Sequence, residues 1–425
     1  MQRRLQVPWN PSAVSRLLIT PGLPRHAWLL QAGVTLNFFG NGLVAPYLVI
    51  YLHFDRGIPL SLAALAVGSG GILATTSGLI VGALVDRFGP RTCLAFAMSS
   101  NAVAYAAYTQ VHASWQAFAV GMAVGVGTGA YGPSVQALLS GFVHPEQRAA
   151  ALSQQRMSAI VGLSLGGLAS AALVAAGVPW VYTVLLLLDS ATFLGFAILL
   201  MFLPNPHIVR SGASGGYRAA LRDRRLRLLA VVSLVMVGAG IAPMLWILPA
   251  FARGIPGVAV GSIGLIYAVN TAVILLLQLQ ITRAADGRSP TLMLAIGAGI
   301  WTLAWGVVAI TGSLLRGWFA VGALAGAMTV YAIGECIYTA VVTPTAAAVA
   351  PPLLRGRYLA VMGLAWQAGF MLGPPAAGAL VSVQPLAFPL VAAATCALLA
   401  LVLLSLGGHL WAGSSSVTTD VVKRT

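Results

Sequence analysis

Charged residues are scarce in this chain. They make up 7% of its 425 residues, against roughly 25% in an ordinary soluble domain. Hydrophobic residues make up 59% of the sequence, and the mean hydropathy is +0.91. So little charge cannot cover a water-exposed surface, which excludes a typical soluble enzyme and predicts an integral membrane protein.

Lysine is nearly absent, since Lys423 is the only one. A phosphate-binding loop ends its glycine-rich run in a lysine, so the sequence excludes a pump with its own nucleotide site of that kind. The three cysteines, Cys93, Cys336 and Cys396, lack any paired spacing, and the six histidines lie in loops or at the ends of apolar runs. We therefore expect neither a disulfide framework nor a metal site, and no cofactor.

Long apolar runs are abundant instead. A transmembrane helix needs about 20 apolar residues. The sequence contains runs of this length, bounded by arginines, prolines and polar turns, and therefore predicts an all-helical membrane protein. Twelve runs qualify: 27–52, 60–85, 92–111, 114–142, 149–177, 179–203, 228–252, 258–282, 291–312, 317–347, 358–382 and 385–411.

The arginines indicate the orientation. With an even number of spans, nineteen basic residues fall on the side of both termini, and only Arg56, Arg253 and Arg316 fall on the other. The positive-inside rule then places both termini in the cytoplasm of a bacterial inner-membrane protein. The bases are spread between spans and not gathered on one face, so the net charge of +15 does not predict a nucleic-acid partner.

A polar stretch over 204–227 divides six spans from six. We predict a cytoplasmic segment 1–26, a bundle over 27–203, a linker over 204–227, a second bundle over 228–411 and a tail over 412–425. The basic part of the linker, with Arg222, Arg224 and Arg225, fits an amphipathic segment on the anionic leaflet or a solvated loop that sets topology.

The two halves resemble each other in sequence. Arg56-Gly57-Ile58-Pro59 returns as Arg253-Gly254-Ile255-Pro256, and the pair Asp86 and Pro90 returns as Asp286 and Pro290. In the first span of each half, Gly40, Gly42 and Pro46 are echoed by Gly238, Gly240 and Pro243. Parallel repeats of this kind place a substrate site near the midplane, between the halves.

The loop after the second span carries Gly82, Leu84, Asp86, Arg87, Gly89 and Arg91. This spacing resembles the signature of the major facilitator superfamily. The resemblance implies 12 transmembrane helices in two pseudo-symmetric six-helix bundles, alternating access, a monomer, and a gating role for the charge cluster. We expect the small Gly82 to let two helices approach. The alternative is that the charges only orient the loop. The second copy keeps Asp286 and Arg288 and is otherwise degenerate.

Span eleven resembles bacterial drug:proton antiporters of that superfamily. It carries Gly369, Gly373, Pro374 and Gly378, after a loop with Arg355, Gly356 and Arg357. Span four lacks the arginine, and span five the proline, that those members have.

Two acids lie inside predicted spans, where an unpaired ionised group costs about 2.5 to 3.5 kcal/mol. Glu335, in span ten, is predicted to exchange a proton or pair with a cationic solute, the alternative being a bond to a neighbouring helix. Asp189, in span six, is expected to make a structural hydrogen bond. Arg156, in span five, fits an anion contact or a side chain that extends to the cytoplasmic surface.

The remaining candidates for solute contact are Asn41, Tyr131, Trp246 and Gln367, together with Asn37 and Trp366. They suit a mostly apolar molecule, because few polar groups are present to replace the hydration of a sugar. No nucleophile-and-base constellation predicts an enzyme. The sequence therefore favours proton-coupled efflux of a small amphipathic solute through the lipid bilayer. The alternative is uptake or facilitated diffusion of a hydrophilic nutrient such as a sugar or organic acid.

Overall fold

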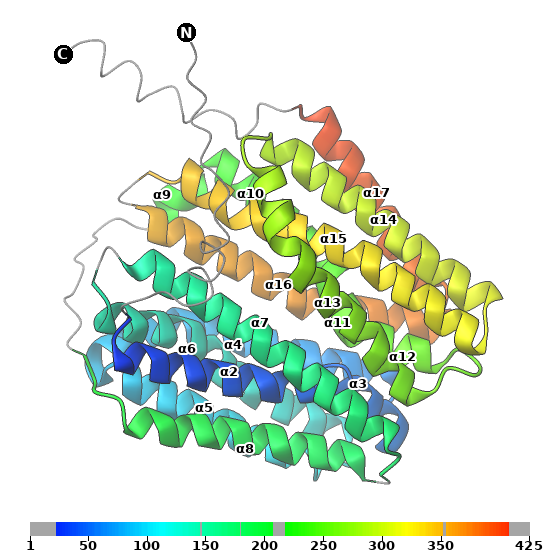
Figure 1. Ribbon diagram of the computed structural model, residues 1–425, viewed down its shortest axis with the longest axis horizontal. Helices are drawn as coiled ribbons and strands as arrows, with labels where there is room; N and C mark the ends of the chain where they lie inside the picture. The colour runs from blue at the N-terminus through cyan, green and yellow to red at the C-terminus, as the bar shows by residue number, and fades with distance from the viewer. Residues whose placement is uncertain (1–22, 145–146, 179, 207–216, 352–353, 408–425) are drawn as a thin grey trace.

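A computed structural model describes residues 23–144, 147–178, 180–206, 217–351 and 354–407. The described chain is helical throughout and forms two bundles that lie side by side (Figure 1). The first bundle contains α2 (Arg25–Val44) with α3 (Leu48–Ile50) and the π-helix η1 (Tyr51–Asp55), then α4 (Leu60–Phe88), α5 (Pro90–Tyr108), α6 (Ser114–Phe142), α7 (Arg148–Ala175) and α8 (Val181–Met201).

The second bundle follows a short helix, α9 (Tyr217–Arg222). It contains α10 (Arg224–Met236), the π-helix η3 (Val237–Ile241), α11 (Ala242–Trp246) and α12 (Leu248–Arg253), then α13 (Val260–Ala285), α14 (Pro290–Leu314), α15 (Gly317–Val349), α16 (Arg355–Val383) and α17 (Ala387–Ser405). The predicted cytoplasmic tail, 412–425, and most of the N-terminal segment lie outside the described residues.

Each of the twelve predicted spans coincides with a helix or with a run of consecutive helices, which confirms the fold class. Among the described residues, nine such segments are long and apolar enough to cross a membrane by length and composition. The other three spans, α5, α6 and α16, are as long but richer in small and polar residues, and each packs against a neighbour. Small residues favour close helix contacts in a membrane.

The first span of each bundle consists of consecutive helices with a break beside a proline. In the first bundle, the helix stops at Val44 and resumes at Leu48, on either side of Pro46. In the second, a π-helix over Val237–Ile241 precedes Pro243, and Ile247 separates α11 from α12. Proline removes a backbone donor and strains the preceding turn, and π-helical turns often mark functional sites.

The structure reproduces the sequence repeat only in part. Pro90 and Pro290 both start a helix, but Gly89, with φ of 82°, directly precedes Pro90, whereas Gly287, with φ of 72°, lies three residues before Pro290. At the other loop Gly57 has φ of 67°, whereas its sequence counterpart Gly254 has φ of −73°. There the motif of the second half has the same residues in a different conformation.

The two ends of the molecule differ in charge. One end carries the start of α2 and the end of α17, and with them Arg25, Arg87, Arg148, Arg224 and Arg283. We call it the arginine-rich end. The opposite end, with Arg56, Arg253 and Arg316, is the arginine-poor end.

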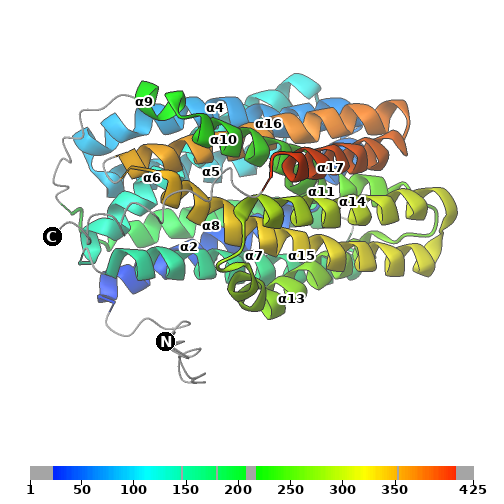
Figure 2. The ribbon, with the colours of Figure 1, turned by 90° about the horizontal axis from the view of Figure 1, so that it is seen from above.

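The bundles meet along two seams, α4 against α16 and α7 against α13 (Figure 2). Gly68 packs on Met371 and Pro375, and Gly264 packs so closely on Ala171 that a Cβ atom would overlap it. These residues all lie toward the arginine-poor end of their helices, where α3 also contacts α12. The two bundles are therefore packed together at that end.

Candidate functional site

Glu335 lies about halfway along α15, at its seam with α13. Its carboxylate is half-buried and lies beside the side chain of Asn270 on α13. One helical turn away, the Thr339 hydroxyl contacts Gln278 Oε1 at 3.3 Å, and Gln278 Nε2 donates to the Cys336 carbonyl at 3.4 Å. The acid is thus set in a polar strip that joins two helices of the second bundle.

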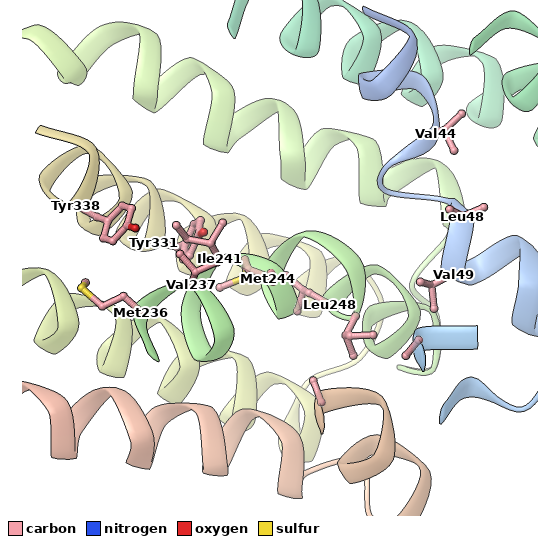
Figure 3. Close-up of a cluster of buried hydrophobic side chains, with 14 of the residues drawn as sticks. Val44, Leu48, Val49, Met236, Val237, Ile241, Met244, Leu248, Tyr331 and Tyr338 are labelled. Carbon is pink, nitrogen blue, oxygen red and sulfur yellow. The ribbon is translucent and has the colours of Figure 1, made fainter. Parts of the chain in front are cut away.

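Aromatic side chains extend from this strip across the bundle. Tyr331 stacks on Trp301 of α14 with ring centroids 5.4 Å apart, and Tyr338 lies 5.9 Å from Trp366 of α16. The Tyr338 hydroxyl meets Ser233 Oγ at 2.6 Å. Figure 3 shows Tyr331 and Tyr338 beside the apolar side chains of the broken span, and Leu48 and Val49 of the first bundle near Leu248. The packing neighbours of Glu335 toward α14 and α16 are therefore aromatic and apolar.

The first bundle has a polar group of its own. Tyr131 packs edge-on against Phe38 of α2 at 6.0 Å, and its buried hydroxyl lies near Gln155 of α7. Asn41 is half-buried and donates to the Asn37 carbonyl at 2.8 Å, which commits part of its amide to its own helix.

The other predicted contact residues lie apart from these groups. Trp246 and Gln367 are half-buried, on α11 and α16, which pack together. Arg156 is exposed on α7, between the buried Gln154 and Ser158. The structure joins none of these three to Glu335 by a contact within the described residues.

The gating motif needs one correction. Gly82 was expected to let two helices approach, but it is exposed, and a Cβ atom there would meet nothing within 4 Å. The glycine that is required is Gly89, because its φ is 82° and Asn205 packs directly on it. Arg91 donates from Nη1 to the Leu203 carbonyl at 2.7 Å, which fastens the loop to the end of α8.

The remaining charges of both motif copies face outward. Asp86 and Arg87 are exposed, and the Arg87 guanidinium lies 5.2 Å from the Phe88 ring. Asp286 and Arg288 are exposed in the second copy. All of them lie at the arginine-rich end, away from the seams that hold the bundles together.

Sequence reasoning missed Asn270, Gln155 and Tyr338. Asn270 interrupts an apolar run, and a polar residue inside a span is itself a functional signal. Several buried polar atoms have no hydrogen-bond partner within the described residues, among them Asn37 Oδ1, Gln154 Oε1 and Asn270 Oδ1. Such atoms can accept a hydrogen bond from a solute or from water. The described residues hold no cluster of three His, Cys, Asp or Glu side chains that could bind a metal.

A broken first span in each bundle, an acid halfway along a helix and two bundles packed together toward one end fit an alternating-access carrier. The sequence model of the Major Facilitator Superfamily matches residues 32–331. The chain belongs to this superfamily. It is therefore a multi-pass membrane transporter of small molecules, and not an enzyme.

Curated relatives are distant. An MFS-type transporter of Bacillus subtilis, YhjO, is 22% identical over 355 residues, which cover 82% of this chain and 86% of the relative. The multidrug resistance protein MdtH of Klebsiella pneumoniae is 24% identical over 346 residues, which cover 80% and 82% of the two chains.

Solved structures agree on the fold. The nucleoside transporter NupG superposes with a TM-score of 0.71 at 15% identity, covering 90% of this chain and 99% of its own. The inward-open xylose transporter XylE of E. coli gives 0.68 at 14% identity, covering 89% and 95%. A peptide transporter, POT, in complex with sulfate gives 0.73 at 16% identity, covering 91% and 96%.

Proposed function

We propose that this protein is a proton-coupled exporter of small amphipathic molecules in a bacterial inner membrane, with both termini in the cytoplasm. The observation that carries the proposal is the position of Glu335, a half-buried carboxyl group halfway along α15 beside Asn270. Burying a carboxyl group at this depth costs free energy, so such groups usually have a function. Proton exchange during transport is one such function. One proton that crosses the membrane potential supplies about 2.3 kcal/mol per 100 mV to drive transport.

The walls around Glu335 support an apolar solute. Tyr331 and Tyr338 are buried against other aromatic rings, and Trp366 is half-buried, so few free hydrogen-bond donors surround Glu335. A hydrophilic sugar would lose its hydration there without full replacement, whereas a compound with an aromatic body and one polar group would not. The similarity to the multidrug resistance protein MdtH points in the same direction.

The packing of the bundles supports a conformational assignment. The seams between them lie at the arginine-poor end, which the positive-inside rule places outside the cell. The motif of Asp86 and Arg87 lies at the other end, and both side chains are exposed there. We assign the structure to an inward-facing state in which this motif is released, in keeping with the similarity to inward-open XylE.

The test is proton release from energised everted vesicles, scanned over amphipathic cations, neutral antibiotics, nucleosides and sugars. Wild type is compared with Glu335→Gln, and Asp189→Asn is the matched control, because Asp189 is the other acid within a span and is fully buried. We expect an amphipathic compound to discharge the gradient in wild type and in Asp189→Asn, but not in Glu335→Gln. Equal discharge by Glu335→Gln would remove the proposed role of Glu335.

Uptake of a hydrophilic nutrient is the second candidate. The polar strip of Asn270, Gln278, Glu335 and Thr339 favours it, because these side chains could bind a sugar or nucleoside. Accumulation of a labelled sugar or nucleoside in right-side-out vesicles, without discharge of the gradient in the everted ones, would select uptake over efflux.

A further inference from the structure

A cavity of about 710 Å³ opens at the arginine-poor end, away from Glu335. Both bundles line it. His53, Phe54 and Leu60 come from the first bundle, and Phe251, Arg316 and Leu386 are among the residues from the second. Its volume lies within the range of roughly 300 to 1,000 Å³ that is usual for small-molecule pockets.

The chemistry of the lining selects a class of ligand. Phe54, Phe251 and Leu386 make an apolar wall, and Arg316 is the one ionised side chain among the described lining residues, with His53 as the other titratable group. The Arg316 guanidinium is exposed and forms no hydrogen bond or ion pair with any described residue. The next residue, Gly317, donates its N–H to the Pro256 carbonyl at 3.0 Å, which fixes the loop beside the cavity.

Two of the three other polar side chains in the lining, those of His53 and Ser382, are partly committed, and the third is the neutral amide of Gln384. His53 Nδ1 bonds the Ile58 carbonyl at 2.9 Å, and Ser382 Oγ donates to the Gly378 carbonyl at 2.8 Å. No acidic residue lines the cavity within the described chain. The site is therefore apolar with one free cation, which favours an apolar molecule with an anionic head.

The cavity exists only while the bundles are together at this end. Its walls come from both, so its volume depends on their separation. A ligand that binds one conformation and not the other stabilises the first in proportion to its differential affinity. Occupancy of the cavity would thus hold the arginine-poor end closed.

We propose that this cavity is a second binding site, which takes a small aromatic or aliphatic anion through Arg316 and arrests the carrier with its arginine-poor end closed. The site goes beyond the proposed function and depends on neither proton coupling nor the direction of export. The anion has two possible sources, a soluble organic acid or the head group of an anionic lipid.

The test is binding of 2-naphthoate to the full-length protein in phosphatidylcholine nanodiscs, measured by equilibrium dialysis. We expect Arg316→Gln to weaken binding at least tenfold. The matched control is Arg25→Gln, an exposed arginine at the other end and outside both gating motifs, which should bind within twofold of wild type. Phe54→Ala, which removes part of the apolar wall, is expected to weaken binding as well. Equal affinity in Arg316→Gln, or equally tight binding of uncharged 2-naphthylmethanol, would overturn the proposal.

A second readout tests the arrest. Spin labels at Gln110→Cys and Leu390→Cys, exposed residues of the two bundles at this end, report their separation. Added 2-naphthoate should narrow the distance distribution toward the short population in wild type and leave Arg316→Gln unchanged. Weaker naphthoate binding to wild type in phosphatidylglycerol nanodiscs would identify the lipid head group as the occupant, and unchanged binding would identify a soluble anion. A distribution that widens or does not respond in wild type contradicts the arrest.

Discussion

The guanidinium of Arg253, at the end of α12 in the second bundle, lies 5.8 Å from the centre of the Phe54 ring in the first. Asp55, the next residue, interacts electrostatically with Arg56 and, more weakly, with Arg253. The counterpart of Arg253 in the sequence repeat, Arg56, behaves differently. It donates from Nε to the Tyr51 hydroxyl at 2.7 Å and bonds the Thr109 carbonyl, so its contacts stay within its own bundle.

This difference gives the first prediction. Arg253→Ala should loosen the arginine-poor end, because it removes a contact that crosses between the bundles. A cation–π contact is worth about 0.5 to 1 kcal/mol at an exposed site, so we expect the open population to rise roughly two- to fivefold. Distances between spin labels at Gln110→Cys and Leu390→Cys measure that population.

The control is Arg56→Ala. It should lower the melting temperature by a few degrees while leaving the distance distribution as in wild type, since its partners belong to one bundle. An equal change of the distribution in both variants would show that Arg253 has no special role in closure.

The second prediction concerns the seam between α7 and α13. Gly264→Val should prevent closure of the arginine-poor end and reduce transport at least tenfold, because a side chain there overlaps Ala171. Ala171→Gly should partly rescue the milder Gly264→Ala, since it frees the space that the new methyl group needs. Transport by Gly264→Ala that is unaffected, or not improved by the second change, would show that this contact does not limit the conformational cycle.

The third prediction separates two glycines of the gating motif. Gly89→Ala should destabilise the protein by about 1 to 2 kcal/mol, because an L side chain disfavours positive φ and Asn205 occupies the space. Gly82→Ala should be neutral or slightly stabilising, because the position is helical and open. Thermal unfolding in detergent compares the two, and a larger loss for Gly82→Ala would contradict the assignment.

The fourth prediction concerns Asn270. Asn270→Leu should lower transport about tenfold with little change in melting temperature, because it removes the amide beside Glu335 while keeping side-chain volume. Gln278→Leu, on the same helix and seam, is the matched control and should retain most activity. If Gln278→Leu is as impaired as Asn270→Leu, the whole polar strip, and not the pair with Glu335, is required.

The membrane class, the twelve spans and the family can be predicted from the sequence, because each depends on local properties. Apolar length, proline and glycine at turns, and the placement of arginines are all visible along the chain. The prediction of Gly82 as a helix contact was wrong because such a contact is not a local property. Whether a glycine faces a neighbour or open space depends on how the helix is rotated, which no local pattern records.

Which residues contact one another depends on the tertiary structure. Asn270 comes to Glu335 from 65 residues away. Of the two arginines of one repeated motif, Arg56 contacts its own bundle, whereas Arg253 contacts the other bundle. The cavity beside Arg316 has walls from both bundles, so it depends on their relative position. Packing between helices sets these relationships, and packing is a property of the assembled molecule.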